Sequence, residues 1–249
     1  MEVFFWIIGV ALICFVIIEA SFLSCYGIVS KRLSSRTMPF SRKIPGAKST
    51  VMFFGDSTAY GAGAEKPEYS VAGRLASEFP RVNLLNFAQN GIRAKTLVGI
   101  LEQHATERAD LAIVHIGGID IFSLTHPKKF SVAFERVLIL TKQIANNRVI
   151  MLCSTNMGSL PYFHYPLSIF YEWNTRRVHR IIHTLIEKHM VAYVDLFEEK
   201  EEDQMLKDIQ RYFAKDRIHP SGEGYALWYK KVSDVIKKYG WGTMLDKSY

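Results

Sequence analysis

Residues 51–61 read Val-Met-Phe-Phe-Gly-Asp-Ser-Thr-Ala-Tyr-Gly, an apolar run that stops at a glycine and is followed by a polar turn. Short apolar runs bounded by turn residues are typical of strands that are buried on both faces. Similar runs occur further along the chain, at residues 82–87, 111–116, 148–153 and 191–196. This stretch therefore predicts the first strand of a buried sheet.

Longer amphipathic stretches separate these apolar runs, at residues 70–78, 94–108, 127–146, 166–189 and 222–238. Alternating strands and helices are typical of a parallel sheet with helices on both faces. We therefore expect an α/β fold, namely a flavodoxin-like three-layer α/β/α sandwich with a mostly parallel five-stranded sheet. In such folds the active site forms at the carboxyl ends of the strands.

A hydrophobic stretch precedes the predicted sheet. Val3 to Leu23 is apolar apart from Glu19 and Ser21, and about 20 residues are needed to cross a hydrocarbon core of roughly 30 Å. The start, Met-Glu-Val, lacks the basic residues of a cleaved signal peptide, so we expect the segment to be retained. Residues 1–29 are therefore predicted to form an N-terminal transmembrane helix.

Basic residues follow the hydrophobic stretch. The net charge is +7, and residues 30–48 contain Lys31, Arg32, Arg36, Arg42, Lys43 and Lys48 without any acidic residue. Attraction to membrane lipid headgroups explains this position better than nucleic-acid binding, for which basic residues would be interleaved with aromatics on the folded domain. We expect a basic juxtamembrane tether over 30–48 and a globular domain over 49–249. The positive-inside rule predicts a single-pass membrane protein whose domain faces the cytoplasm.

Two distant segments carry residues that suit nucleophilic chemistry. Ser57 stands just after the first predicted strand, where a hydroxyl is exposed at the sheet edge. Near the end of the chain, Asp216-Arg217-Ile218-His219-Pro220 places a carboxylate three residues before an imidazole. A carboxylate so placed can fix the imidazole tautomer and stabilise the imidazolium formed when the serine loses its proton.

Two further polar segments follow predicted strands, at residues 86–91 and 117–120. With the serine and the Asp-x-x-His pair, their order resembles the SGNH (GDSL-type esterase) family over most of residues 51–229. The resemblance implies that Ser57 is the nucleophile and first oxyanion donor, Gly91 the second donor, His219 the base and Asp216 its orienting group. It also implies an enzyme that hydrolyses carboxylic ester or thioester bonds.

One position departs from the family pattern. The third block of the family usually reads Gly-x-Asn-Asp, with the asparagine as a third oxyanion donor, but here Ile119 stands at that place. An isoleucine side chain donates no hydrogen bond, and one such donor is worth about 10²- to 10³-fold in rate. Three explanations are open: a slower enzyme, a substitute donor such as Asn90 or Asn156, or a fold retained for a non-catalytic task.

The segment after the fourth predicted strand, residues 156–166, is unusually rich in apolar and aromatic residues for a loop. We expect Asn156, Leu160, Tyr162 and Phe163 to line a site for an acyl chain, so the favoured substrate is a lipid or small-molecule ester such as a lysophospholipid or acyl ester. Closure of the core by these aromatics is nearly as well supported. The alternatives are a carbohydrate O-acetyl esterase and a catalytically silent, membrane-tethered binding domain.

The remaining candidate ligands give no metal or cofactor prediction. Cys14, Cys25 and Cys153 show no disulfide or metal-type spacing, so we expect them to be apolar filler. His179 and His183 have the i, i+4 spacing of zinc ligands but lack the glutamate of a His-Glu-x-x-His motif. We therefore expect no metal site and no cofactor, and the sequence gives no indication of oligomeric state.

Overall fold

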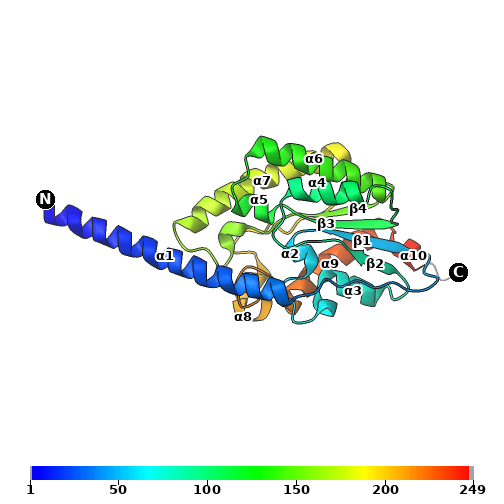
Figure 1. Ribbon diagram of the computed structural model, residues 1–249, viewed down its shortest axis with the longest axis horizontal. Helices are drawn as coiled ribbons and strands as arrows, with labels where there is room; N and C mark the ends of the chain where they lie inside the picture. The colour runs from blue at the N-terminus through cyan, green and yellow to red at the C-terminus, as the bar shows by residue number, and fades with distance from the viewer. Residues whose placement is uncertain (1, 247–249) are drawn as a thin grey trace.

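A twisted sheet of five parallel strands forms the centre of the domain in this computed structural model, which describes residues 2–246 (Figure 1). The strands are β1 (Thr50–Gly55), β2 (Asn83–Asn86), β3 (Leu111–His115), β4 (Val149–Leu152) and β5 (Ala192–Val194). Their spatial order is β2-β1-β3-β4-β5, which is the flavodoxin-like order. The predicted five-stranded parallel sheet is confirmed, and each strand lies within the range predicted for it or within one residue of it.

β1 is buried on both faces because it lies between two neighbours and beneath helices on either side. Its residues Val51 to Phe54 are each at most 2% exposed. β1 pairs with β3 so that Gly55 lies opposite His115. The register therefore brings the carboxyl ends of the central strands to one edge, where parallel α/β folds place their sites.

Helices cover both faces of the sheet (Figure 1). The longer ones of the domain are α3 (Val71–Glu78), α4 (Ala94–Gln103), α6 (Pro127–Ile144), α7 (Leu167–His189) and α9 (Gly222–Lys238). α4, α6 and α7 pack side by side over one face, and α3 packs with α9 over the other. Short elements complete the chain: α2 (Ser57–Tyr60), α5 (Gly118–Phe122), α8 (Ile209–Tyr212), α10 (Gly242–Leu245) and the 3₁₀ helices η1 (Pro67–Tyr69), η2 (Met157–Ser159) and η3 (Gln204–Lys207).

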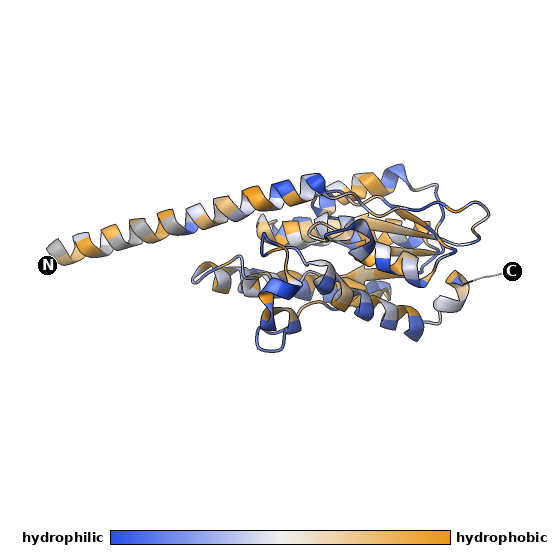
Figure 2. Cartoon of the chain, turned by 90° about the horizontal axis from the view of Figure 1, so that it is seen from below, coloured by the Kyte–Doolittle hydropathy of each residue, from blue (hydrophilic) through white to orange (hydrophobic). Residues whose placement is uncertain are grey.

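The first helix, α1 (Glu2–Arg36), is a single helix of 35 residues. Its N-terminal part projects away from the domain, and its C-terminal part lies against it (Figure 1). The projecting part carries large apolar side chains that are more than half exposed, among them Trp6 at 75%, Ile13 at 60% and Ile17 at 58%. Figure 2 shows this hydrophobic character along the helix.

The predicted transmembrane helix is not supported. Within residues 2–246, none of the helices combines the length and the apolar character needed to cross a membrane. The stretch predicted to span, Val3 to Leu23, includes Glu19, a residue that is only 8% exposed and whose carboxylate lies beside His164 of the domain.

Aromatic and charged side chains attach the C-terminal part of α1 to the domain. Glu19 Oε1 lies 3.5 Å from Nδ1 of His164, and the rings of Phe22 and His164 are 5.6 Å apart. The rings of Tyr26 and Tyr162 are 6.0 Å apart. α1 continues to Arg36 instead of ending at residue 29, so part of the predicted tether is helix.

The rest of the predicted tether is fixed to the edge of the sheet. Arg42 and Leu84 exchange two backbone hydrogen bonds of 2.8 Å as an antiparallel bridge beside β2. The Arg42 guanidinium also donates to the carbonyls of Ala76 and Phe79 at 2.8 and 3.0 Å. Residues 37–48 therefore belong to the globular domain and hold the end of α1 close to it.

Candidate active site

Ser57 is placed by the sharp turn between β1 and α2. Gly55 has φ +143°, and a Cβ there would lie 2.0 Å from the carbonyl oxygen of His115, so only glycine fits. The next residue, Asp56, caps α2 by accepting a hydrogen bond from the Thr58 N–H at 3.0 Å. Ser57 is thus the first residue of α2, where a helical N–H has no partner within the helix.

His219 is placed by a tight turn between α8 and α9. Ala214 N–H donates to the His219 carbonyl at 2.8 Å, and Arg217 adopts the left-handed conformation with φ +57°. Gly63 allows this turn to approach the nucleophile, because a Cβ at Gly63 would lie 2.7 Å from that of His219. Ser221 caps α9 through its hydroxyl, which accepts from Gly224 N–H at 3.3 Å.

The three residues predicted from the sequence meet in one hydrogen-bonded chain. Nε2 of His219 lies 2.8 Å from Oγ of Ser57, and Nδ1 of His219 lies 2.5 Å from Oδ2 of Asp216. All three are buried, with Asp216 at 0% exposure. An imidazole that donates from Nδ1 to the carboxylate has Nε2 free to accept the serine proton.

The Asp216 carboxylate is kept ionised although it is buried. Burial alone would raise its pKa, but the hydrogen bond and charge of His219, with the backbone N–H groups of His219 and Ile218, lower the pKa below its usual value. Both N–H groups donate to Oδ1 at 3.1 Å. The negative charge therefore remains available to stabilise a protonated His219.

A cavity of ≈ 540 Å³ opens in front of Ser57 and His219. Most of its wall is apolar, with Phe122, Met157, Leu160, Tyr162, Ile218 and Trp228 among the lining residues. α1 forms one side through Gly27, Ser30, Lys31, Ser34 and Ser35. This side was not predicted from the sequence, because these residues were expected to lie in a membrane anchor and a tether.

The predicted oxyanion donors differ in position. Gly91 lies on the cavity wall in the left-handed conformation with φ +73°. Ile119 also lines the cavity, so a hydrocarbon side chain stands where the resemblance implies a donor. Asn90 directs its side-chain amide to the Ser34 carbonyl of α1 at 3.0 Å, and Asn156 is absent from the cavity lining within the described part of the chain.

The loop predicted to line the site does so only in part. Leu160 and Tyr162 reach the cavity, whereas Phe163 packs behind it, with its ring stacked on that of Tyr171 at 4.1 Å. Asn156 is 3% exposed and caps η2 by accepting from Gly158 N–H at 3.2 Å. The lining prediction is therefore wrong for Phe163 and Asn156, because both side chains stabilise the loop from inside.

A second buried histidine faces the cavity. His115, at the end of β3, lines the cavity, and its Nδ1 lies 2.9 Å from Oγ1 of Thr58. That hydroxyl donates to Asp56 at 2.6 Å. Burial lowers the pKa of His115, although the negative charge of Asp56 partly opposes the shift. This buried histidine therefore also borders the site.

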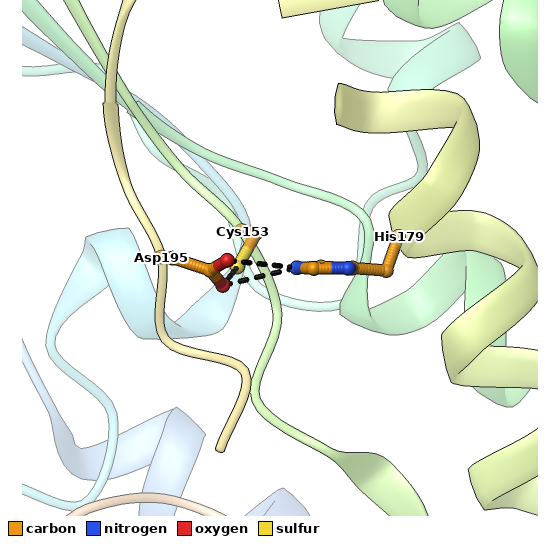
Figure 3. Close-up of side chains that lie close together, drawn as sticks. All are labelled: Cys153, His179 and Asp195. Carbon is orange, nitrogen blue, oxygen red and sulfur yellow. Dashed lines mark hydrogen bonds and ion pairs between the residues drawn. The ribbon is translucent and has the colours of Figure 1, made fainter. Parts of the chain in front are cut away.

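Outside this cavity, a cysteine, a histidine and an aspartate lie close together. Figure 3 shows the side chains of Cys153, His179 and Asp195 directed toward one another. Cys153 is fully buried in the apolar core, as expected of apolar filler, but its thiol also lies 3.1 Å from the carboxylate of Asp195. Asp195 escaped notice in the sequence because nothing at this position forms a recognisable motif with residues 153 or 179.

The fold and the site define the class of protein. A parallel α/β/α sandwich that holds a serine, a histidine and an aspartate in hydrogen-bond contact at one edge of its sheet is suited to nucleophilic acyl chemistry. Residues 53–227 match the GDSL-like Lipase/Acylhydrolase family. The chain therefore belongs to this family, and the resemblance seen in its sequence motifs is confirmed.

Solved structures share the fold at low sequence identity. A lipolytic protein of the G-D-S-L family from Veillonella parvula DSM 2008 is 20% identical with a TM-score of 0.57, over 76% of this chain and 98% of that one. TesA is 17% identical with a TM-score of 0.59, over 76% and 98% of the two chains. The acetyl xylan esterase AlAXEase is 17% identical with a TM-score of 0.57, over 75% and 99%. No curated protein matches the chain.

Proposed function

We propose that this protein is a serine esterase in which Ser57, His219 and Asp216 form the catalytic triad. The observation that carries the proposal is the continuous hydrogen-bonded chain from the Ser57 hydroxyl through His219 to Asp216, with distances of 2.8 and 2.5 Å. Ser57 and His219 also border the cavity, so an ester bound there would lie next to the nucleophile.

The geometry supports a two-step acyl transfer. His219 Nε2 takes the Ser57 proton while Oγ attacks the carbonyl carbon of the ester, and the same proton then passes to the departing alcohol or thiol. Water next attacks the acyl-enzyme and gives a proton to His219, and the acid leaves as Ser57 regains its hydrogen. The Asp216 charge stabilises the imidazolium in both steps.

The developing oxyanion would be held by two backbone donors, the N–H groups of Ser57 and Gly91. Ile119 supplies no third donor at this site. Since one donor is worth about 10²- to 10³-fold in rate, we propose an enzyme that is slower than a relative with three donors. Asn90 does not replace the missing amide in this arrangement, because its side chain binds the Ser34 carbonyl.

The cavity favours an ester with an apolar acyl chain, such as a lysophospholipid or a long-chain acyl ester or thioester. Its volume of ≈ 540 Å³ and its apolar wall suit a chain longer than acetyl. Lys31 of α1 also lies on the lining, where its ammonium would suit a headgroup phosphate. The acetyl group that a carbohydrate O-acetyl esterase removes is too short to fill an apolar cavity of this size.

We also propose that α1 holds the enzyme at a membrane, with the domain on the cytoplasmic side. The exposed apolar side chains from Phe4 to Ile17 support this proposal, because burying each large one in lipid would contribute about 1.5–3 kcal/mol. The basic residues Lys31, Arg32 and Arg36 would contact anionic headgroups.

A fluorophosphonate probe tests the catalytic proposal. The full chain should be labelled, and Ser57→Ala should abolish labelling and ester hydrolysis without unfolding, because the Ser57 side chain contributes little packing. Nitrophenyl esters of increasing acyl length would then define the substrate, with the highest kcat/KM expected for long chains. Hydrolysis retained in pure Ser57→Ala would overturn the triad, the absence of labelling in the wild type would point to a silent binding domain, and preference for acetyl would point to a carbohydrate esterase.

A further inference from the structure

A group of metal-ligating side chains lies where two neighbouring strands end beneath α7. Cys153 directly follows β4, Asp195 directly follows β5, and His179 and His183 project from α7. Figure 3 shows Cys153, His179 and Asp195 converging from these three elements. The catalytic chain of Ser57, His219 and Asp216 uses none of these residues.

The donor atoms are already close together. Nε2 of His179 lies 3.0 and 3.1 Å from the two carboxylate oxygens of Asp195, and the Cys153 sulfur lies 3.1 Å from Oδ1. One ligand atom from each residue lies within 4.8 Å of the other two. Tetrahedral ligands bound to zinc at about 2.0–2.3 Å lie roughly 3.5 Å from one another, so only small side-chain shifts are needed.

Burial and the negative charge of Asp195 raise the pKa of the Cys153 thiol, so the charge of a bound metal ion would have to stabilise a thiolate here. Leu196 N–H donates to the Cys153 sulfur at 3.1 Å, which would stabilise the charge of a metal-bound thiolate. His183 Nε2 lies 3.2 Å from Oδ2 of Asp195 and Phe197 N–H lies 2.9 Å from Oδ1, so both oxygens are oriented by neighbours. Such outer contacts commonly orient metal ligands.

The group of side chains is buried at the cysteine and partly exposed to solvent at the carboxylate. Cys153 is buried at 0% exposure, whereas the side chains of Asp195 and His183 are each 40% exposed. A metal ion could enter from solvent and meet a protected thiolate. One imidazole, one thiolate and one carboxylate form a donor set that zinc uses in proteins, and soft sulfur disfavours magnesium and calcium.

We propose that Cys153 Sγ, His179 Nε2 and a carboxylate oxygen of Asp195 bind a zinc ion, with water as the fourth ligand. The ion would join the ends of β4 and β5 to α7. The next residues after Cys153, Ser154 and Thr155, line the catalytic cavity, so the ion would also fix the start of the loop that walls the site. The thiol proton is released when the sulfur binds the metal.

Cobalt(II) added to the purified full-length protein tests this site, because a cobalt–thiolate bond gives a charge-transfer absorption in the near ultraviolet. We expect the band to saturate at one cobalt per chain and to disappear when zinc is added. Cys153→Ser should abolish the band. Loss of a residue that only contacts a metal ligand weakens metal binding about 10- to 100-fold. His179 is proposed as a ligand itself, so His179→Gln should weaken zinc binding by at least that much.

Two control variants separate this site from other features. Cys25→Ser removes the exposed cysteine of α1 and should keep the band, and Ser57→Ala should lose esterase activity but bind cobalt as the wild type does. Circular dichroism shows whether Cys153→Ser and His179→Gln are folded. Failure of the wild type to bind one cobalt, or a band that survives in folded Cys153→Ser, would overturn the zinc site whether or not the esterase is active.

Discussion

A single side chain, Ile119, separates this site from the family pattern. It stands at the position of the expected asparagine and lines the cavity beside Ser57. In the proposed mechanism the two oxyanion donors that remain are backbone groups, the N–H groups of Ser57 and Gly91. A side chain that donates a hydrogen bond at position 119 should therefore strengthen transition-state binding.

Ile119→Asn should raise kcat by up to about 10²-fold, since one oxyanion donor is worth that much or more. KM should change little, because the donor acts mainly in the transition state. Ile119 is partly exposed to the cavity, so the new amide can reach water in the resting enzyme and should cost little stability. Steady-state kinetics on a short-chain nitrophenyl ester gives the answer, with Ile119→Leu as the control. An unchanged or lower kcat in a folded Ile119→Asn protein would contradict the two-donor account.

His115 should make the fold sensitive to mild acid. Burial lowers its pKa in the folded state, whereas the unfolded histidine titrates near about 6.5. As the pH falls below that value the unfolded state binds the proton more readily, so the free energy of unfolding decreases. His115→Asn keeps a group able to donate to Thr58 but removes the titration.

Urea unfolding at pH 7.5 and 5.5 measures this effect. The wild type should lose more stability between the two pH values than His115→Asn does. Other titrating groups are common to both proteins, so the difference between them isolates His115. Equal losses would show that His115 does not titrate differently in the folded and unfolded states.

Among the elements, α1 has the most unexpected role, because it supplies one side of the catalytic cavity. Ser30 lies on that wall, and Tyr26 and Glu19 attach the helix to the loop that carries Tyr162 and His164. Selection of the acyl chain should therefore depend on this helix as well as on the domain.

Ser30→Trp should shorten the acyl chain that the enzyme accepts. The indole would fill part of the cavity, so kcat/KM for long-chain esters should fall by about tenfold or more, given that misfit of a single methylene costs about 1–3 kcal/mol. Hydrolysis of the acetyl ester should stay nearly unchanged because the triad is untouched. Ser24→Trp adds the same bulk at an exposed position of α1 outside the cavity lining and should act as the wild type. Equal losses on acetyl and long-chain esters would contradict the role of α1.

The elements and residues that could be predicted are those determined by neighbouring residues in the sequence. β1 to β5 could be predicted closely because each is a short apolar run that ends at turn residues. Ser57 and the Asp216-x-x-His219 pair could be predicted because their spacing along the chain reflects their chemistry. The contact of Ser30 with the cavity and the burial of Phe163 depend on tertiary packing, which no periodicity records. The Cys153–Asp195 contact likewise requires the pairing of β4 with β5.

At the scale of the whole molecule, the projecting part of α1 should direct the enzyme to membranes. Replacing Trp6, Ile13 and Ile17 together with serine removes three large side chains that are each more than half exposed. This variant should move from the membrane fraction to the soluble fraction after cell lysis, while its activity on a short-chain ester is kept. Val132→Ser, which removes another exposed apolar residue from the domain surface, should leave the distribution unchanged. Release of the wild type into the soluble fraction would contradict the proposal.

The orientation of the domain is a separate prediction that rests on the basic residues after the hydrophobic stretch. Alkaline phosphatase fused after Tyr249 in a bacterial host should be inactive, because that reporter folds only outside the cytoplasm, where its disulfides form. A β-galactosidase fusion at the same point should be active. The reverse pattern would overturn the cytoplasmic orientation and leave the esterase assignment intact.

The position of α1 on the cavity wall also places part of the substrate-facing surface on a different element from the proposed catalytic residues. The proposed nucleophile and base lie at the sheet edge, whereas Ser30, Lys31 and Ser34 come from the helix α1. Substitutions in that helix should therefore change which substrates are accepted without changing the proposed catalytic residues. Chimaeras that exchange only residues 2–36 between homologous enzymes should then keep the turnover chemistry of one parent and shift toward the chain-length preference of the other.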